Sequence, residues 1–255
     1  MVKERIDTIL VQKGYAPSRE KACGLIMAGE VYVNNNCITH PGKKIDVQAS
    51  IEIKKRGIPY VSYGGIKLAH AITYFQLTIH GKKALDIGSS TGGFVDCLLH
   101  MGASRVYAID VGTHQLHERL RDDPRVICKE HFNARYLTYT DIGEHVDIIT
   151  IDVSFISLKK ILPPAVSLLK EDGHIISLVK PQFEVGRSDV GKGGIVKSMD
   201  KIQHAINDMK NFGTALGLQP VNIMEAPREK ERKNREFFIL WELQRNPHLS
   251  RSLQA

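Results

Sequence analysis

Apolar residues near the start of the chain recur at the three- and four-residue spacing of one helix face. This spacing predicts a first helix that begins near Ile6 and ends at Gly14, because glycine often follows the last residue of a helix. Ser18 is the predicted N-cap of a second helix over residues 19–27, which Gly29 would close. The first segment of the chain is therefore predicted to form two short helices.

Short segments of alternating apolar and polar residues follow these helices. Residues 31–33, 45–47 and 51–53 each favour a strand, and the asparagines at 34–36 favour a turn. A basic stretch that contains glycine and proline comes next and separates the two halves of the chain. The pattern therefore predicts a small α+β domain over residues 1–60, built from two helices and a small sheet.

From residue 61 onward, short apolar runs alternate with helical segments, which is typical of a doubly wound parallel sheet. The last two runs follow a predicted helix over 201–216 and are joined by a short connection, so they should pair as an antiparallel hairpin. We therefore expect an α/β domain with a seven-stranded, mostly parallel sheet over residues 61–245 and a C-terminal tail over 246–255. The predicted strands are 84–87, 106–110, 126–128, 146–153, 174–179, 220–224 and 237–243, and helices are also expected at 94–101 and 158–169.

The composition is that of a folded globular protein with a basic surface. Hydrophobic residues make up 42% and charged residues 25% of 255, which excludes disordered and collagen-like chains. A net charge of +7 favours polyanionic partners. Residues 1–60 hold ten Lys and Arg against six Asp and Glu, although on composition alone a solvated face explains these charges better than RNA binding does.

The cysteines and the apolar stretches indicate in which cellular compartment the protein is expected. Cys23, Cys37, Cys97 and Cys128 form no CxxC pair and have no metal-ligand spacing with histidine, so we expect reduced thiols and no metal site. The N-terminus lacks the apolar core of a signal peptide, and charges and prolines interrupt the longest apolar stretch, 148–169. These features predict a cytoplasmic protein that does not associate with membranes.

A glycine-rich turn follows the first predicted strand of the second domain. The sequence Asp86-Ile87-Gly88-Ser89-Ser90-Thr91-Gly92-Gly93-Phe94 allows a tight backbone turn and a close approach to a ligand, although a purely structural turn explains it about equally well. Asp110 ends the next strand, 24 residues after Asp86, a spacing typical of the acid that meets ribose hydroxyls. Asn133 lies just past the third strand, where it could reach an adenine. The candidate cofactor-binding residues are Asp86, Gly88, Ser89, Gly92, Gly93, Phe94, Asp110 and Asn133.

Four further charged residues stand in distinctive surroundings. They are Lys67 in GGIKL, Asp152 in IDVSF, Lys180 in LVKPQFE and Glu236 in NREFF. Asp152 and Lys180 end the fourth and fifth predicted strands, the edge at which a parallel sheet presents its chemistry. Taken singly, each charge is more typical of an ordinary ion pair or an exposed side chain.

The first domain resembles the S4 RNA-binding domain across nearly its whole length. The resemblance lies in the order Arg5-Ile6-Asp7, Gly14, Ser18-Arg19, Ala22, Ile26, Gly29-Glu30-Val31, Val33-Asn34 and Gly42. It implies that Arg5, Arg19 and Lys21 contact RNA phosphates, a docking role that carries little sequence information by itself.

The second domain resembles S-adenosylmethionine methyltransferases. The string DIGSSTGG resembles their first motif better than a nicotinamide site, and the four charged residues resemble the Lys-Asp-Lys-Glu tetrad of the FtsJ-like 2′-O-methyltransferases. Together with the S4 module and Lys192-Gly193-Gly194-Ile195-Val196, the pattern over residues 3–243 is similar to the TlyA family, whose members are called hemolysins and act as rRNA cytidine 2′-O-methyltransferases. This similarity implies a Rossmann-like fold, S-adenosylmethionine as cofactor, and ribosomal RNA or ribosomal subunits as partner.

The chemistry of ribose methylation gives each tetrad residue a role. A ribose hydroxyl is a poor nucleophile at neutral pH, so a lysine that accepts its proton is needed. Lys180 is the candidate base, and Lys67 is the neighbouring cation that orients the hydroxyl. Asp152 and Glu236 are expected to hold the two ammonium groups, and no metal is required.

Two alternatives to an active enzyme predict different features in the sequence. A membrane-active cytolysin is suggested only by the family's name, and the sequence shows neither an export signal nor a spanning segment. An RNA-binding protein with an inactive catalytic domain would not need to keep all four tetrad residues. The chain departs from the family pattern at Tyr63, where arginine is usual, and at 228–233, which replaces a small glycine-containing turn and is either a further RNA contact or, as we prefer, a solvated loop.

Overall fold

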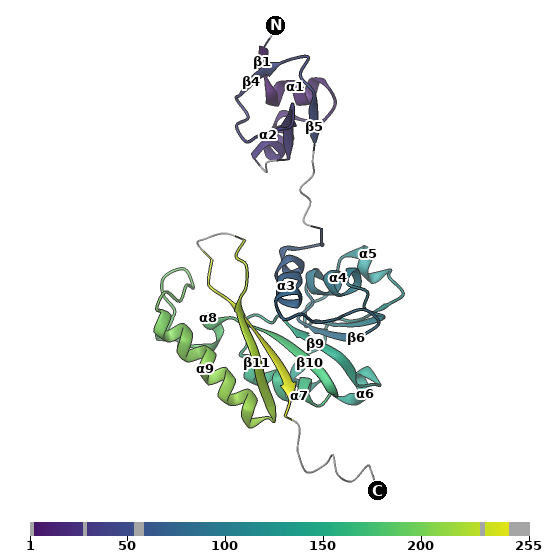
Figure 1. The fold of residues 1–255 in the computed structure, drawn as a ribbon, viewed down its shortest axis with the longest axis vertical. Coiled ribbons are helices and arrows are strands. Elements are labelled where there is room, and N and C mark those ends of the chain that lie inside the picture. The colour runs from purple at the N-terminus through teal and green to yellow at the C-terminus, as the bar shows by residue number, and fades with distance from the viewer. Residues whose placement is uncertain (1–2, 28–29, 54–58, 230–232, 245–255) are drawn as a thin grey trace. The chain divides into compact units, whose positions relative to one another are not determined.

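The computed structural model describes residues 3–27, 30–53, 59–229 and 233–244. Contacts divide the chain into two compact units, Met1–Ile58 and Pro59–Ala255 (Figure 1). Gly29, most of the basic stretch between the units and the expected tail at 246–255 lie outside the described residues.

The described residues of the first unit form two helices and five three-residue strands. These strands form two small sheets, with orders β1-β4 and β3-β2-β5, where one sheet was expected. β1 has the sequence KER and β3 the sequence NCI, and neither alternates apolar and polar residues, so neither was predicted. Asn34 and Asn35 adopt positive φ angles of 47° and 65° and form the turn between β2 and β3. The elements are β1 (Lys3–Arg5), α1 (Ile6–Gln12), α2 (Arg19–Met27), β2 (Val31–Val33), β3 (Asn36–Ile38), β4 (Lys44–Asp46) and β5 (Ile51–Ile53).

The second unit is built on one seven-stranded sheet, as predicted. The strand order is β11-β12-β10-β9-β6-β7-β8, and all neighbours are parallel except β12, which runs antiparallel to both β11 and β10. The predicted terminal hairpin is therefore confirmed, and its second strand lies inside the sheet. The strands are β6 (Lys83–Ile87), β7 (Arg105–Ile109), β8 (Val126–Lys129), β9 (Val146–Ile151), β10 (Leu169–Val179), β11 (Leu218–Glu225) and β12 (Phe237–Leu243).

Helices cover both faces of this sheet (Figure 1). The helix expected at 158–169 is wrong as a single element: a 3₁₀ turn and a five-residue helix occupy its first part, and Leu169 already belongs to β10. Pro163 and Pro164 lack the N–H groups that a longer helix would need, so they are tolerated only in its first turn. The helices are α3 (Tyr63–Tyr74), α4 (Gly93–His100), α5 (Glu118–Arg121), η1 (Ala134–Tyr136), α6 (Tyr139–Ile142), η2 (Leu158–Lys160), α7 (Leu162–Val166), α8 (Pro181–Glu184), η3 (Arg187–Asp189) and α9 (Met199–Ala215).

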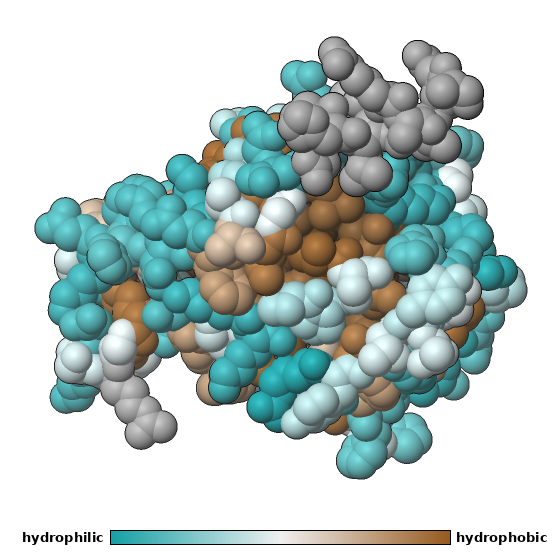
Figure 2. Space-filling model, turned by 90° about the horizontal axis from the view of Figure 1, so that it is seen from below, coloured by the Kyte–Doolittle hydropathy of each residue, from teal (hydrophilic) through white to brown (hydrophobic). Residues whose placement is uncertain are grey.

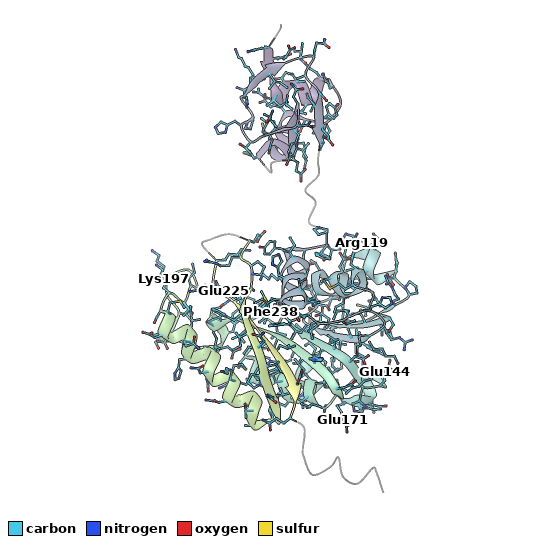
Figure 3. The ribbon with its side chains drawn as sticks, in the orientation of Figure 1. Arg119, Glu144, Glu171, Lys197, Glu225 and Phe238 are labelled. Atoms are coloured by element: carbon cyan, nitrogen blue, oxygen red, sulfur yellow. The ribbon has the colours of Figure 1, made fainter. Side chains whose placement is uncertain are left out.

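Two apolar clusters pack on opposite faces of the sheet because successive strand residues point to opposite sides. One cluster joins the sheet to α3 and α4, and the other joins it to α7 and α9. Figure 3 shows Phe238 inside the unit, where it is fully buried, and Glu171 and Lys197 at its margins. Figure 2 shows another face, on which apolar side chains gather at the centre and hydrophilic ones surround them.

Candidate active site

The register of the sheet brings the chemically active side chains to one edge. Ile87 at the end of β6 pairs with Ile109 of β7 and with Ile151 of β9, so these three parallel strands end at the same level. At the neighbouring antiparallel pair, Val179 lies opposite Phe237. Lys180 and Glu236, which flank this last pair, therefore reach the same edge from strands that run in opposite directions.

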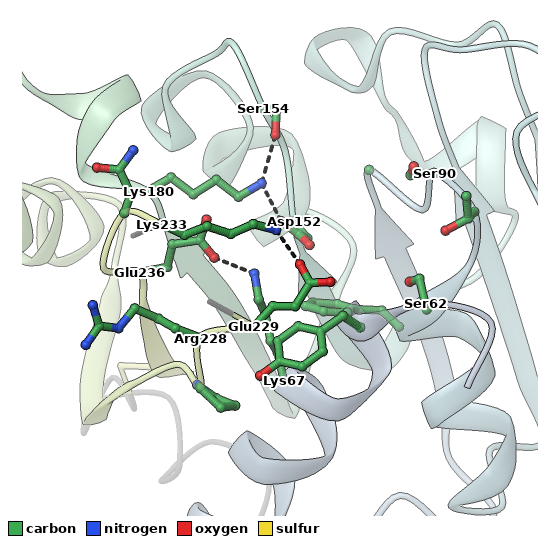
Figure 4. Close-up of a pocket in the computed structure, with 18 of the residues that line it drawn as sticks. Ser62, Lys67, Ser90, Asp152, Ser154, Lys180, Arg228, Glu229, Lys233 and Glu236 are labelled. Atoms are coloured by element: carbon green, nitrogen blue, oxygen red, sulfur yellow. Dashed lines mark hydrogen bonds and ion pairs between the residues drawn. The ribbon is translucent and has the colours of Figure 1, made fainter. Parts of the chain in front are cut away.

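The four predicted tetrad residues form two lysine–carboxylate pairs in one place (Figure 4). Lys180 Nζ lies 2.7 Å from Asp152 Oδ1, and Lys67 Nζ donates a hydrogen bond of 2.5 Å to Glu236 Oε2. Lys180 Nζ also donates to Ser154 Oγ at 2.8 Å, a contact that the sequence did not suggest. The side chains of Lys180 and Lys67 are only 12% and 19% exposed, so both ammonium groups are held largely away from solvent.

A pocket of about 300 Å³ connects the tetrad to the glycine-rich turn. Of the predicted cofactor-binding residues, Gly88, Ser89, Gly93 and Phe94 line this pocket, together with all four tetrad residues. Asp86, Gly92, Asp110 and Asn133 do not line it. The pocket thus joins one half of the predicted cofactor site to the four residues predicted to carry the chemistry.

Glycine is required at the turn because the backbone passes close to its neighbours. Gly88 has a φ of 86°, and a Cβ there would lie 2.5 Å from the carbonyl oxygen of Asp152. A Cβ at Gly93 would lie 2.2 Å from Ser62 Oγ. Any side chain at either position would push apart the turn and the segments that carry Ser62 and Asp152.

Asp86 lies beneath the turn and is fully buried. Thr150 Oγ1 donates a hydrogen bond of 2.5 Å to its Oδ1, whereas Oδ2 has no hydrogen-bond partner among the described residues. Burial raises the pKa of Asp86 to about 8, and the nearby carboxylates of Asp152 and Asp110 act in the same direction. The turn therefore rests on a buried acid whose raised pKa favours the protonated form and whose pKa no cation among the described residues lowers.

Asp110 fastens the turn to the loop that follows β7. Its Oδ2 accepts a hydrogen bond from the Ser90 backbone N–H at 2.7 Å, and its Oδ1 accepts one from the Gly112 N–H at 2.6 Å. Each carboxylate oxygen has two lone pairs, so these bonds leave Asp110 able to accept further hydrogen bonds. Asn133, by contrast, uses its side-chain oxygen to cap η1, accepting from the backbone N–H of Arg135 at 3.2 Å.

Glu130 was missed by sequence reasoning, yet it orders the loop after Asp110. Its carboxylate accepts hydrogen bonds from the backbone N–H groups of His114, Gln115 and Leu116 at 2.7 to 3.0 Å. Burial alone would raise the pKa of Glu130, but these N–H groups and Arg121 outweigh it and hold the pKa at about 2. The role of Glu130 depends on the loop at His114–Leu116 folding back onto its carboxylate, and the residues next to Glu130 in the sequence do not indicate this contact.

Two further residues beside the tetrad also escaped the sequence analysis. Asn234 accepts a hydrogen bond from the Val196 N–H at 2.9 Å and donates one to the Gly194 carbonyl at 2.8 Å, so it joins the KGGIV segment to the start of β12. Phe155 follows Ser154 with a φ of 63° and a side chain that is 92% exposed. A bulky residue in this left-handed conformation is strained, and such residues are frequent at functional sites.

Two of the three basic residues predicted to dock RNA contact a buried acid in the first unit. The Asp7 side chain is 1% exposed and accepts hydrogen bonds from Arg5 Nη2 and from Arg19 Nε, both at 2.9 Å. These guanidinium groups hold the pKa of Asp7 well below its usual range. Arg5 and Arg19 remain 44% and 61% exposed, and Lys21 is exposed on the first turn of α2.

In the part of the chain that the structure describes, no helix is long and apolar enough to cross a membrane. In the same residues, no group of three or more His, Cys, Asp or Glu side chains is placed to hold a metal ion.

A mostly parallel seven-stranded sheet with an antiparallel β12, a glycine-rich turn after β6 and a tetrad at the carboxyl edge define a Rossmann-like methyltransferase. Comparison with known proteins agrees: residues 60–243 match the FtsJ-like methyltransferases, and residues 4–51 match the S4 domain. The chain belongs to the FtsJ-like methyltransferase family, and similarity over both units places it with the TlyA proteins. The predicted fold class and family are thereby confirmed.

Similar proteins carry names that describe rRNA methylation or hemolysis. The "Putative rRNA methyltransferase YqxC" of Bacillus subtilis (strain 168) is 44% identical over 93% of this chain and 85% of its own length. The 16S/23S rRNA (cytidine-2′-O)-methyltransferase TlyA of Mycobacterium tuberculosis (strain ATCC 25618 / H37Rv) is 38% identical over 97% of this chain and 93% of its own. The solved structure of a "Putative hemolysin" from Streptococcus thermophilus matches with a TM-score of 0.72 and 38% identity, covering 96% of this chain and 90% of that one.

Proposed function

We propose that this protein is an S-adenosylmethionine-dependent methyltransferase that modifies the 2′-hydroxyl of cytidine in ribosomal RNA, in the cytoplasm. The observation that carries the proposal is the meeting of two lysine–carboxylate pairs with the glycine-rich turn in one pocket. The name of the M. tuberculosis relative supports the substrate and the position modified. An intact tetrad favours an active enzyme over an RNA-binding protein with an inactive catalytic unit.

The residues of the turn fit S-adenosylmethionine. Gly88 and Gly93 line the pocket without side chains, which lets a ligand approach the backbone closely, and α4 begins at Gly93, so its first amides are near the same pocket. The carboxylate of Asp110 adds negative charge near a ligand whose sulfur is positive. Asp110 would hold the ribose, and the residues from Gly88 to Phe94 would hold the methionine end.

The tetrad residues prepare the ribose hydroxyl for reaction. When bound, S-adenosylmethionine supplies an electrophilic methyl group on a positively charged sulfur. Lys180 in its neutral form accepts the proton of the 2′-hydroxyl, and Asp152 and Ser154 fix the position of its Nζ. Lys67, held by Glu236, orients the hydroxyl oxygen and stabilises the negative charge that develops on it.

The RNA substrate is supported by features of both units. The S4 unit presents Arg5, Arg19 and Lys21, and such contacts to phosphate fix the position of a protein on RNA. In the catalytic unit, the exposed ring of Phe155 lies 5.2 Å from that of Phe183, close to the tetrad residue Asp152 in the chain. Exposed aromatic side chains are the usual stacking partners of unpaired bases.

The proposal is tested by mapping 2′-O-methyl groups on rRNA from cells with and without this gene. We expect at least one cytidine to lose its methyl group in the deletion strain and to regain it with the wild-type gene. Purified protein, S-adenosylmethionine and the unmethylated RNA should then restore the group in vitro. An identical methylation map in both strains, together with no transfer in vitro, would overturn the proposal.

A further inference from the structure

The connection between β11 and β12 brings charged side chains to the mouth of the pocket. Arg228 and Glu229 at its start and Lys233 near its end line the pocket together with the tetrad. Figure 4 shows Lys233 extending over the pocket toward the carboxylate of Glu229, with which it forms an ion pair. The described part of this segment therefore belongs to the pocket, where a solvated loop had been the preferred interpretation.

The charged side chains that line the pocket carry a net positive charge. The tetrad contributes two lysines and two carboxylates and is neutral as a group. Arg228, Glu229 and Lys233 add two cations and one carboxylate, so the surplus positive charge comes from the connection. A ribose in RNA is flanked by phosphodiesters that carry one negative charge each, which is the charge that this surplus fits.

The two cations are held by contacts that an anion can replace. Lys233 and Glu229 are 59% and 40% exposed, and exposed ion pairs at this four-residue spacing contribute little to stability. Arg228 Nε lies 3.7 Å from Glu225 Oε1, a carboxylate that Arg235 already contacts through two of its N–H groups. A phosphate at the pocket mouth would gain two charge-assisted contacts and would compete with the exposed Glu229 carboxylate for Lys233.

We propose that Arg228 and Lys233 bind an RNA phosphate next to the target ribose, and that this phosphate displaces the Glu229 carboxylate from Lys233. Together they position the ribose over Lys180, so they are positioning residues for the substrate. The inference rests on the proposed function, because it names the RNA group that the same pocket holds.

The test is steady-state methyl transfer to unmethylated ribosomal RNA at several salt concentrations, with the full chain. Lys233→Gln and Arg228→Gln should each raise the KM for RNA about five- to tenfold with little change in kcat, and should lower the salt slope by ~1. Glu229→Gln should lower the KM, because the competing carboxylate is gone. Lys210→Gln on α9, which removes the same charge away from the pocket, should leave the KM unchanged.

Lys233→Gln and Glu229→Gln should change the KM in opposite directions. This difference distinguishes phosphate binding by Lys233 from an ion pair that only stabilises the segment between β11 and β12. If Glu229→Gln raises the KM as Lys233→Gln does, the pair only holds the loop, and the inference is wrong. It is also wrong if Lys233→Gln and Arg228→Gln behave like Lys210→Gln. Failure of the wild-type protein to transfer methyl groups would instead reject the proposed function, whereas transfer with unaltered KM values in the variants rejects the phosphate contact alone. Lys233→Arg keeps the charge and should retain a KM near that of the wild type.

Discussion

Asp7 in the first unit and Asp86 in the second are both fully buried, and their surroundings differ in opposite ways. Asp7 in the first unit contacts the guanidinium groups of Arg5 and Arg19, which hold its pKa well below the usual range. Asp86 in the second unit has a hydroxyl partner on one oxygen and no hydrogen-bond partner on the other among the described residues, and burial raises its pKa to about 8. One acid is compensated by charge, and the other is left uncompensated.

The difference matches the roles of the two units. A buried acid paired with exposed arginines stabilises a small domain and also fixes cations at its surface, where RNA can reach them. A buried acid without a cation costs stability, and such groups cluster at functional sites. Under the proposed function, the first unit uses its charges for structure and for docking RNA, while the second keeps a buried acid with a raised pKa under the turn proposed to hold the cofactor.

The two aspartates should give stability opposite dependences on pH. The low folded pKa of Asp7 adds stability above its unfolded pKa of about 3.9, and this contribution is lost as the pH falls below that value. The raised pKa of Asp86 favours the protonated acid in the folded state. Its contribution is complete below about 3.9 and is lost as the pH rises to about 8.

The prediction with the largest expected effect tests whether catalysis depends on the second unit alone. Lys180→Met should lower the single-turnover rate of methyl transfer by ~10²–10⁴ with saturating cofactor and RNA, because the proton acceptor is gone. S-adenosylmethionine should still bind, as calorimetry can show. Lys21→Gln in the first unit should leave the saturated rate unchanged. A near wild-type rate in Lys180→Met would exclude this base and favour catalysis by positioning alone.

The second prediction concerns the pH dependence that Asp86 imposes. Trp241 is the single tryptophan and is fully buried in the second unit, so its fluorescence reports the unfolding of that unit. In urea unfolding between pH 5 and 8, wild type should lose up to about 1.4 kcal/mol per pH unit relative to Asp86→Asn. Asn keeps an acceptor for Thr150 but cannot ionise.

Asp7→Asn serves as the matched control for Asp86→Asn. It should leave the pH slope of the Trp241 signal unchanged, because Asp7 is already ionised over this range and lies in the other unit. Parallel slopes in wild type and Asp86→Asn would show that Asp86 ionises normally, and the contrast between the two buried acids would then fail.

The third prediction tests whether the acid beside the turn serves the cofactor. Asp110→Ala should weaken S-adenosylmethionine binding about 10- to 100-fold in calorimetry, because it removes the expected ribose acceptor and the bond to the Ser90 N–H. Asp122→Ala, at an exposed aspartate after α5, is the control and should bind normally. Unchanged affinity in folded Asp110→Ala would count against the cofactor assignment.

The sequence was sufficient to predict the elements with long hydrophobic patterns and the residues that directly follow predicted strands. The apolar runs of β9 and β10 are long enough to identify as strands, and Asp152 and Lys180 directly follow them. Parallel strands end at one edge, which is why Asp152 and Lys180, far apart in the sequence, could be expected to meet. The resemblance to known families supplied the partners Lys67 and Glu236.

Features that depend on tertiary contacts could not be foreseen. Glu130 gains its role because a loop closes over it, and Ser154 gains its role because Lys180 arrives from another strand. Local propensity also misled at 158–169, where apolar spacing suggested one helix, but two prolines at the start of α7 prevent a continuous helix from 158 onward. The interpretation of 228–233 depended on whether Arg228, Glu229 and Lys233 line the pocket, which charge patterns do not encode.

The smallest expected effect concerns the cations of the first unit and separates their two roles. Lys21 is exposed on α2, whereas Arg19 contacts buried Asp7. Of these two residues, therefore, Arg19 alone should serve both RNA docking and stability. Lys21→Gln should weaken RNA binding a few-fold and reduce the salt slope by ~1, as expected for one phosphate contact, without changing hydrogen exchange in the first unit. Arg19→Gln should do the same to RNA binding and should also speed exchange of the amides around Asp7, because the acid loses one of its two cations. Lys210→Gln controls for the general effect of one positive charge. Should both variants bind RNA with the affinity and salt dependence of Lys210→Gln, the docking surface of the first unit lies elsewhere, and its paired charges serve structure alone.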